Sequence, residues 1–346
     1  MSIPPSSCQC PNDDMPQFLI SKRAIEQGRN MHIFSSRPMV ESFKQARLVG
    51  GLNLSRVRHL TAAMFYRWLD LCHARLEDRE LHARVVLRPV QIGTSSFNVM
   101  SCYLRKVEGA PIPRDSLALL QPGVYGVFLL DETPYEGDVL SPRRFYEPFA
   151  EQAKSLQTIF PEYGTNNTPT RLSDLVKARD QGRCSITGQT GHPTQIVWIY
   201  PPLASFVVDR LDDAIFDKFR LVDNLITICS SLAEPFQRNA FSVDMEDGGR
   251  IIKFVDLPDE SPVLPLYLPA PRPSAVRFWD LNFKYTLAVF LPAGDPATTG
   301  DYDDYVAWME ELSQSQANLR NPKWQTALGR QVLEAYMMRE LAGVYQ

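Results

Sequence analysis

The chain lacks the long hydrophobic runs and the excess of positive charge that mark membrane proteins and nucleic-acid binders. No apolar stretch approaches the roughly 18 residues that a membrane-spanning helix requires, and the longest, Tyr285 to Leu291, is far shorter. The formal net charge of the 346 residues is −4, whereas nucleic-acid binders usually carry a basic field that neutralises phosphates. The composition therefore predicts no membrane span and argues against a nucleic-acid partner.

The cysteines show no paired CxxC spacing. All six are scattered along the chain, which fits reduced thiols better than a disulfide framework or a zinc site. The N-terminus has no basic start followed by an apolar stretch, so no secretory signal is expected. These absences predict an intracellular, cytoplasmic protein.

Familiar catalytic motifs are also missing. The sequence contains no glycine-rich phosphate loop, no GxSxG elbow and no HExxH helix. Its five histidines are scattered and no motif surrounds any serine, so a Ser/His/Asp arrangement is not indicated. We therefore predict no cofactor and no metal ion.

Periodicity predicts an α+β fold. Apolar residues recur at helical spacing from Leu54 to Leu76 and again in the last fifty residues, where Asn321-Pro322 is typical of a helix start. Segments rich in β-branched and aromatic residues predict strands between these regions; they are Ala83 to Ile92, Phe97 to Leu104 and Val124 to Leu130.

Breaks in composition divide the chain into four parts. Residues 1–30 hold prolines among polar residues and are expected to form a mobile tail. Residues 31–165 form a mixed α+β part, residues 170–256 a separate middle domain, and residues 257–346 a proline-rich linker followed by a helical part.

The middle domain contains four distinctive pieces in order. A helix end and turn run from Arg179 to Gly188, and an apolar strand from Gln195 to Tyr200 is halted by two prolines. A second strand with a following helix spans Asp223 to Phe236. Two alternating runs around Asp-Gly-Gly, from Phe241 to Phe254, predict a β-hairpin.

These pieces resemble the HNH endonuclease-like proteins common in fungi, whose pattern is roughly R-D-x-x-x-C-x-x-T-G, then A-H-I-x-P, then N-x-I-x-L-x-x-x-L-H-x-x-F-D. The resemblance covers about a quarter of the chain and implies an HNH-like ββα unit with an added β-hairpin. The matching residues are Arg179, Asp180, Cys184, Thr187, Gly188, Asn224, Ile226, Ile228, Leu232 and Phe236.

The chain departs from this pattern where a nuclease needs its chemistry. In active members the first His deprotonates water, an acidic residue before it often holds the metal, and the last His completes the metal site. Trp198, Val197 and Ala233 stand at those three positions. An indole has no acceptor lone pair and Ala cannot bind a metal, so we predict a degenerate nuclease.

The first hypothesis is that the nuclease cleft implied by the resemblance became an apolar pocket that binds a small molecule. The protein would then be a cofactor-independent enzyme of cyclase or isomerase type in fungal secondary metabolism. Trp198 would form the pocket wall, and Tyr200, Asn224, His192 and Arg238 would supply polar groups. The alternative is a non-catalytic pseudo-nuclease that serves as a binding or scaffold module, with Trp198 filling a core.

A third hypothesis is a metal-dependent nuclease with relocated ligands. His192 precedes Trp198 by six residues, about 20 Å in an extended strand, and would have to fold back to act as the base. An acidic cluster from Asp209 to Asp217 could bind a cation, although a solvated face is the simpler interpretation. Arg171, Lys177, Arg179 and Arg183 form a basic patch that we also interpret as a solvated helix face.

Overall fold

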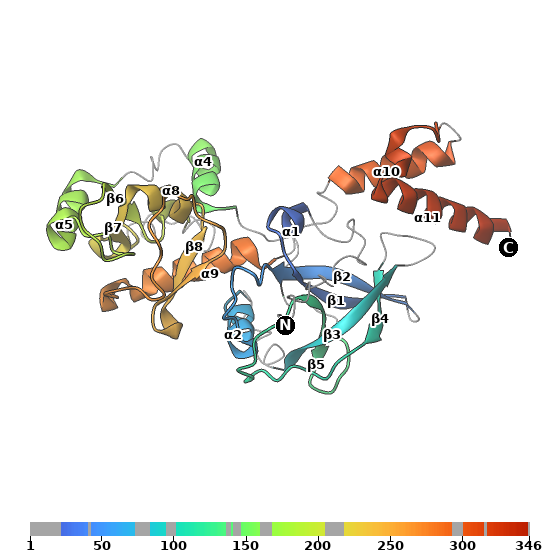
Figure 1. Cartoon of the computed structure of the whole chain (residues 1–346), viewed down its shortest axis with the longest axis horizontal. Helices are drawn as coiled ribbons and strands as arrows, with labels where there is room; N and C mark the ends of the chain where they lie inside the picture. The colour runs from blue at the N-terminus through green and yellow to red at the C-terminus, as the bar shows by residue number, and fades with distance from the viewer. Residues whose placement is uncertain are drawn as a thin grey trace, which may run out of the picture. The chain divides into compact units, whose positions relative to one another are not determined.

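The computed structural model describes residues 22–40, 43–72, 84–94, 102–135, 140, 147–159, 168–204, 218–292, 300–314 and 317–344. The chain divides into two compact units (Figure 1). Unit 1 comprises Met1–Phe145 and Leu291–Gln346, and unit 2 comprises Tyr146–Phe290. Helices and strands occur in both, so the predicted α+β class is confirmed. Within the described ranges, no helix is long and apolar enough to cross a membrane.

Unit 1 is built on a closed five-stranded barrel in the order β1-β2-β4-β3-β5. Its strands are β1 (Met31–Val40), β2 (Phe43–Leu52), β3 (Val85–Thr94), β4 (Cys102–Val107) and β5 (Gly123–Leu129). Neighbouring strands are antiparallel except for β1 and β5, whose parallel pairing closes the barrel. Helix α2 (Ala62–Cys72) buries Phe65, Trp68 and Leu69.

Strands β3, β4 and β5 occur close to the three predicted segments, but β1 and β2 were not predicted. Both interrupt the apolar alternation on which strand prediction relies, β1 with two serines and a proline and β2 with two glycines. The pairing of β1 with β2 explains why position 51 holds a glycine, because a Cβ atom there would lie 2.2 Å from the carbonyl oxygen of Met31. Tertiary pairing therefore overrides the local signal.

The predicted tail ends earlier than residue 30. Helix α1 (Lys22–Glu26) is followed by Arg29, which is only 6% exposed. The Arg29 guanidinium donates hydrogen bonds to the carbonyl oxygen of Pro292 at 2.8 Å and to that of Leu291 at 3.4 Å. These long-range bonds fix residues that sequence composition alone assigned to a mobile segment.

Buried His32 in β1 makes the stability of unit 1 depend on pH. It is 1% exposed, and neither ring nitrogen has a hydrogen-bond partner among the described residues. Burial, and then the positive charge of Arg29, lowers the pKa of His32 to about 4. The unfolded chain, with a pKa near 6.5, takes up this proton first, so the free energy of unfolding decreases as the pH falls from 6.5 through 4. The expected loss is about 3 kcal/mol.

Urea unfolding of the wild type and of His32→Leu at pH 7 and pH 4.5 tests this expectation. The variant lacks the titrating group and should lose less stability between the two pH values. Equal losses would contradict the assignment of the acid sensitivity to His32.

The last two helices, α10 (Gly300–Ser313) and α11 (Ala327–Val344), confirm the predicted helical C-terminus. Helices α10 and α11 lie side by side (Figure 1). Leu312, Trp324 and Val332 form a buried cluster in this part of the chain. Asn321 caps the short helix η10 (Pro322–Gln325), because its side chain accepts a hydrogen bond from the Lys323 amide at 3.0 Å.

The described residues of unit 2 form two small antiparallel sheets with helices packed against them. Strand β6 (Thr194–Trp198) pairs with β7 (Leu225–Cys229), and β8 (Phe241–Asp244) pairs with β9 (Arg250–Lys253) in the predicted hairpin. The α-helices among its described residues are α4 (Phe149–Ile159), α5 (Thr170–Asp180), α8 (Ser230–Gln237) and α9 (Val276–Phe290). Short 3₁₀ turns occur at Pro202–Ala204 (η5), Val222–Asn224 (η6), Met245–Asp247 (η7) and Pro273–Ala275 (η8).

This compact unit is larger than the predicted domain of residues 170–256, because α4 and α9 pack into it. Asn282 on α9 donates a hydrogen bond to the carbonyl oxygen of Ile199 at 2.6 Å. Asn239 accepts one from the amide of Phe149 at 2.9 Å and donates one to Thr286 at 2.8 Å. Such buried polar bonds leave few alternative packings.

Candidate functional site

The two strands and the helix that carry the predicted site are adjacent in unit 2. Ile196 is paired with Thr227, and Trp198 with Leu225, so these four side chains share one face of the β6–β7 sheet. Helix α8 begins directly after the last residue of β7. A long connection from Ile199 to Asn224 joins the two strands.

Arg179 and Asp180, at the end of α5, bind the backbone around β7. The Arg179 guanidinium donates to the carbonyl oxygens of Val222 at 2.9 Å and Leu225 at 2.8 Å, while Asp180 accepts from the amide of Thr227 at 3.0 Å. Burial opposes ionisation of Asp180, but the hydrogen bonds and charge of Arg179 outweigh it and lower the pKa of the carboxyl. The pair therefore fixes α5 to β7.

The rest of the motif forms the turn after α5. The helix ends where Gln181 and Gly182 adopt positive φ angles of 51° and 70°, which confirms the predicted turn. The Cys184 sulfur accepts hydrogen bonds from the amide of Cys229 at 3.3 Å and from that of Thr187 at 3.5 Å. Together with Arg179 and Asp180, this turn makes up what we call the β7 clip, residues 179–188.

Asn224 holds the connection between β6 and β7. Its side-chain amide donates to the carbonyl oxygens of Tyr200 at 2.8 Å and Phe219 at 2.7 Å. Its side-chain oxygen accepts from the amide of Tyr200 at 2.9 Å. Asn224 is fully buried, and its two bonds to Tyr200 are shielded from water. The backbone therefore occupies its side-chain amide.

The three positions to which the HNH resemblance assigned a base and metal ligands are filled by packed side chains. Val197, Trp198 and Ala233 are 2%, 6% and 1% exposed. Trp198 packs with Val176 of α5 and Leu225 of β7. The predicted pocket wall is thus part of the core between α5 and the sheet.

Tyr200 lies in the same interior. It is 1% exposed, and its hydroxyl donates to the carbonyl oxygen of Ala204 at 3.0 Å. Its ring makes edge contacts with Phe149 at 5.6 Å and Tyr285 at 6.2 Å between centroids. Tyr200 and Asn224 are therefore brought together, but as structural partners.

His192 and Arg238 are on the surface of unit 2. His192 is exposed beside Gly191, in the bend before β6. Arg238 is 56% exposed at the end of α8 and pairs with Glu151 at 3.1 Å and Glu234 at 3.8 Å. These two residues are therefore on the surface of unit 2, whereas Trp198, Tyr200 and Asn224 are in its interior.

Metal ligands do not converge in the part of the chain that the structure describes. There, no three side chains of His, Cys, Asp or Glu lie close enough together to hold an ion. The acidic cluster predicted from Asp209 to Asp217 lies outside the described residues. In the basic patch, Arg171, Lys177 and Arg183 are exposed, whereas Arg179 belongs to the β7 clip because its guanidinium binds buried carbonyl oxygens.

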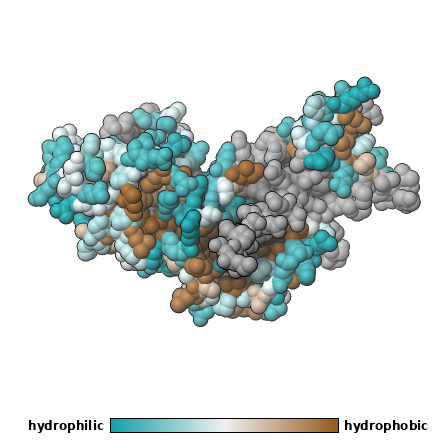
Figure 2. All heavy atoms as spheres, viewed as in Figure 1, coloured by the Kyte–Doolittle hydropathy of each residue, from teal (hydrophilic) through white to brown (hydrophobic). Residues whose placement is uncertain are grey.

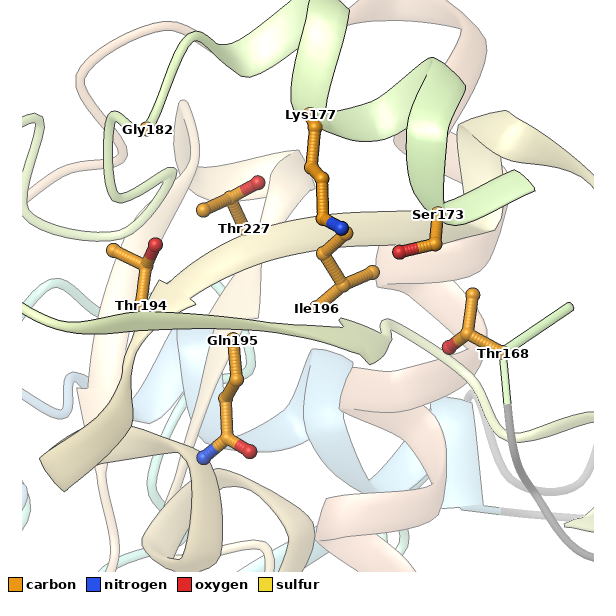
Figure 3. A pocket seen from close by; sticks show the side chains of 8 residues that line it. All are labelled: Thr168, Ser173, Lys177, Gly182, Thr194, Gln195, Ile196 and Thr227. Carbon is orange, nitrogen blue, oxygen red and sulfur yellow. The ribbon is translucent and has the colours of Figure 1, made fainter. Parts of the chain in front are cut away.

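A pocket of about 520 Å³ lies between α5 and the β6–β7 sheet (Figure 3). The Lys177 side chain extends from α5 over Ile196, and the hydroxyl groups of Ser173 and Thr168 lie on the same side of the pocket. The lining is mostly polar and comprises Thr168, Ser173, Lys177, Gly182, Thr194, Gln195, Ile196 and Thr227. Hydroxyl groups, one amide and one ammonium suit a small polar ligand.

The sequence pattern did not point to this pocket, because its residues form no motif. Lys177 was assigned to a solvated helix face, and its side chain is indeed 69% exposed, with Asp174 at 3.9 Å. Figure 2 shows that the part of unit 2 around α5 is hydrophilic on the visible face. Only the packing of α5 over β6 and β7 makes this polar surface concave.

Scans against protein-family models, curated proteins and solved structures found no match for this chain.

Proposed function

We propose that unit 2 contains a degenerate HNH-like ββα module that has lost nuclease chemistry and serves as a non-catalytic binding module. The observation that carries this proposal is the burial of Val197, Trp198 and Ala233 at the three positions that a nuclease requires. Packed apolar side chains there cannot activate water or bind a cation.

The scaffold positions of the motif support the same proposal. Arg179, Asp180 and Cys184 all bind the backbone of β7 or its flanking residues, and Asn224 binds the connection from β6. These contacts stabilise the strand pair without a metal ion. The module therefore retains the hydrogen bonds that stabilise its fold, while packed apolar side chains occupy the positions of the catalytic residues.

The pocket between α5 and the sheet is the binding site that we propose for this module. Lys177 supplies its positive charge, and Ser173 and Thr168 add hydroxyl groups. A small ligand with one anionic group, such as a carboxylate or phosphate, fits this chemistry because a charged hydrogen bond is stronger than a neutral one.

The cyclase- or isomerase-type enzyme ranks second. Such an enzyme needs an enclosed apolar pocket around its substrate, but Trp198, assigned to the wall, and Tyr200, assigned to supply a polar group, are both packed in the interior. The pocket beside them is polar. A nuclease with relocated ligands ranks third, because it would depend on the exposed His192.

Metal-dependent cleavage is the direct test of lost nuclease chemistry. Purified full-length protein should leave plasmid and single-stranded DNA intact with Mg²⁺, Mn²⁺, Ni²⁺ or Zn²⁺. Cleavage that copurifies with the protein and disappears in His192→Ala would overturn the proposal and establish relocated ligands. Cleavage that persists in His192→Ala would also overturn it and would place the base elsewhere.

Anion binding tests the pocket. Inorganic phosphate or acetate should raise the melting temperature of the wild type, by about 3 °C at ten times the dissociation constant. Lys177→Met should abolish this rise, because the variant lacks the ammonium in the pocket.

Lys284→Met is the matched control, since Lys284 is exposed on α9 and does not line the pocket. Neutral glycerol measures the non-specific effect of a cosolvent. Equal shifts for all three proteins would show that the anion acts elsewhere, and the pocket assignment would fail.

A further inference from the structure

Two thiols that are 45 residues apart in sequence meet at the β7 clip. The Cys184 sulfur accepts a hydrogen bond from the amide of Cys229 at 3.3 Å. Cys184 is fully buried, Cys229 is 2% exposed, and both are free thiols. The structure therefore holds two cysteines together that the sequence separates.

Thr187 contacts both sulfurs. Its amide donates to the Cys184 sulfur at 3.5 Å, and its hydroxyl lies 3.9 Å from the Cys229 sulfur. Because the sulfur of Cys229 is only three bonds from its own amide nitrogen, the two sulfurs are within reach of each other after rotation about χ1.

The environment distinguishes the two thiols. Burial opposes ionisation of Cys184, but hydrogen bonds from Thr187 and from Cys229 outweigh it and lower the pKa of Cys184. Burial, followed by the hydrogen bond with Cys184 and its charge, raises the pKa of Cys229 to about 11. Of the two thiols, Cys184 therefore has the better stabilised thiolate.

We propose that Cys184 and Cys229 are a peroxide-sensitive modification site that closes to a reversible disulfide. The Cys184 thiolate attacks one oxygen of a hydroperoxide, so an S–O bond forms, the O–O bond breaks, and water or an alcohol leaves with a proton from solvent. Cys229 then attacks the sulfenic acid. The S–S bond forms, the S–O bond breaks, and water leaves with the Cys229 proton. Two electrons pass from the sulfurs to the peroxide.

The disulfide would covalently join the turn after α5 to the end of β7. Closing this loop restricts the unfolded chain, so the melting temperature of unit 2 should rise by roughly 5 °C on oxidation. This inference goes beyond the proposed function and does not depend on a ligand in the pocket.

The test is a hydrogen peroxide titration of the full-length protein, followed by unfolding, alkylation and tryptic peptide mass spectrometry. We expect a cross-linked species of peptides 184–210 and 221–238 that has lost two hydrogen atoms and is released by dithiothreitol. The melting temperature should rise in parallel. Cys72, half-buried on α2, serves as the internal reference.

Cys72→Ser should leave the cross-link unchanged, whereas Cys184→Ser and Cys229→Ser should each abolish it. The cross-link in the wild-type protein is measured without any substitution, so it tests the proposal even if a variant folds poorly. Separate alkylation of Cys184 and Cys229 at every peroxide concentration would overturn the proposal. So would irreversible oxidation of either sulfur without a cross-link.

Discussion

Trp198→Ala is expected to lower the free energy of unfolding by roughly 3–5 kcal/mol, the usual cost of truncating a buried aromatic side chain. The indole is 6% exposed and packs with Val176 and Leu225. Its removal leaves a cavity between α5 and the sheet, because the backbone there is held by the β7 clip and cannot collapse fully. Unit 2 should therefore melt at a lower temperature than in the wild type.

Urea denaturation followed by circular dichroism measures this effect. Trp198→Phe retains most of the buried ring and should lose clearly less stability, and Leu175→Ala, at a half-exposed position on α5, provides the surface control. The enzyme hypothesis makes the opposite prediction, namely that Trp198→Ala keeps a cooperative fold and loses activity. A loss below about 1 kcal/mol would show that Trp198 is not a core residue.

Asn224→Ala is expected to cost roughly 3 kcal/mol or more, because the change removes three hydrogen bonds that a fully buried side chain makes to the backbone. Two of them join Asn224 to the amide and carbonyl of Tyr200, and the third joins it to the carbonyl of Phe219. A hydrogen bond contributes modestly when formed, but a buried unpaired group carries its full desolvation cost. The connection between β6 and β7 should loosen first.

Amide hydrogen exchange provides the specific measurement. Exchange at Tyr200 should accelerate in Asn224→Ala, and the melting temperature should fall. Gln237→Ala, an exposed substitution on α8, should change neither quantity. Unchanged exchange at Tyr200 would remove the assigned role of Asn224.

Structural features that depend on neighbouring residues could be predicted from the sequence. The end of α5 at Gln181-Gly182, the hairpin around Gly248-Gly249 and the Asn321 cap all depend on backbone freedom or side-chain bonds within a few residues. The α+β class followed from hydrophobic periodicity, which is also local.

The candidate site was predicted less completely. The sequence identified Trp198, Tyr200 and Asn224 as belonging to one region, but it could not distinguish a pocket wall from a packed core. Both environments favour aromatic and apolar residues. The polar pocket beside Lys177 had no sequence signal, since its shape arises only where α5 lies over two strands.

By itself, the sequence determined the local turns and helix ends, the periodicity of the helices and the lack of basic or metal-binding side chains at Val197, Trp198 and Ala233. Only the tertiary structure decided that β1 closes a barrel with β5, that Arg29 binds Pro292, and that Cys184 meets Cys229. The physical reason is the separation along the sequence of the groups that interact. The first set depends on bonds and torsions within a few residues, whereas the second joins groups tens to hundreds of residues apart, which only burial and hydrogen bonding in the folded chain bring together.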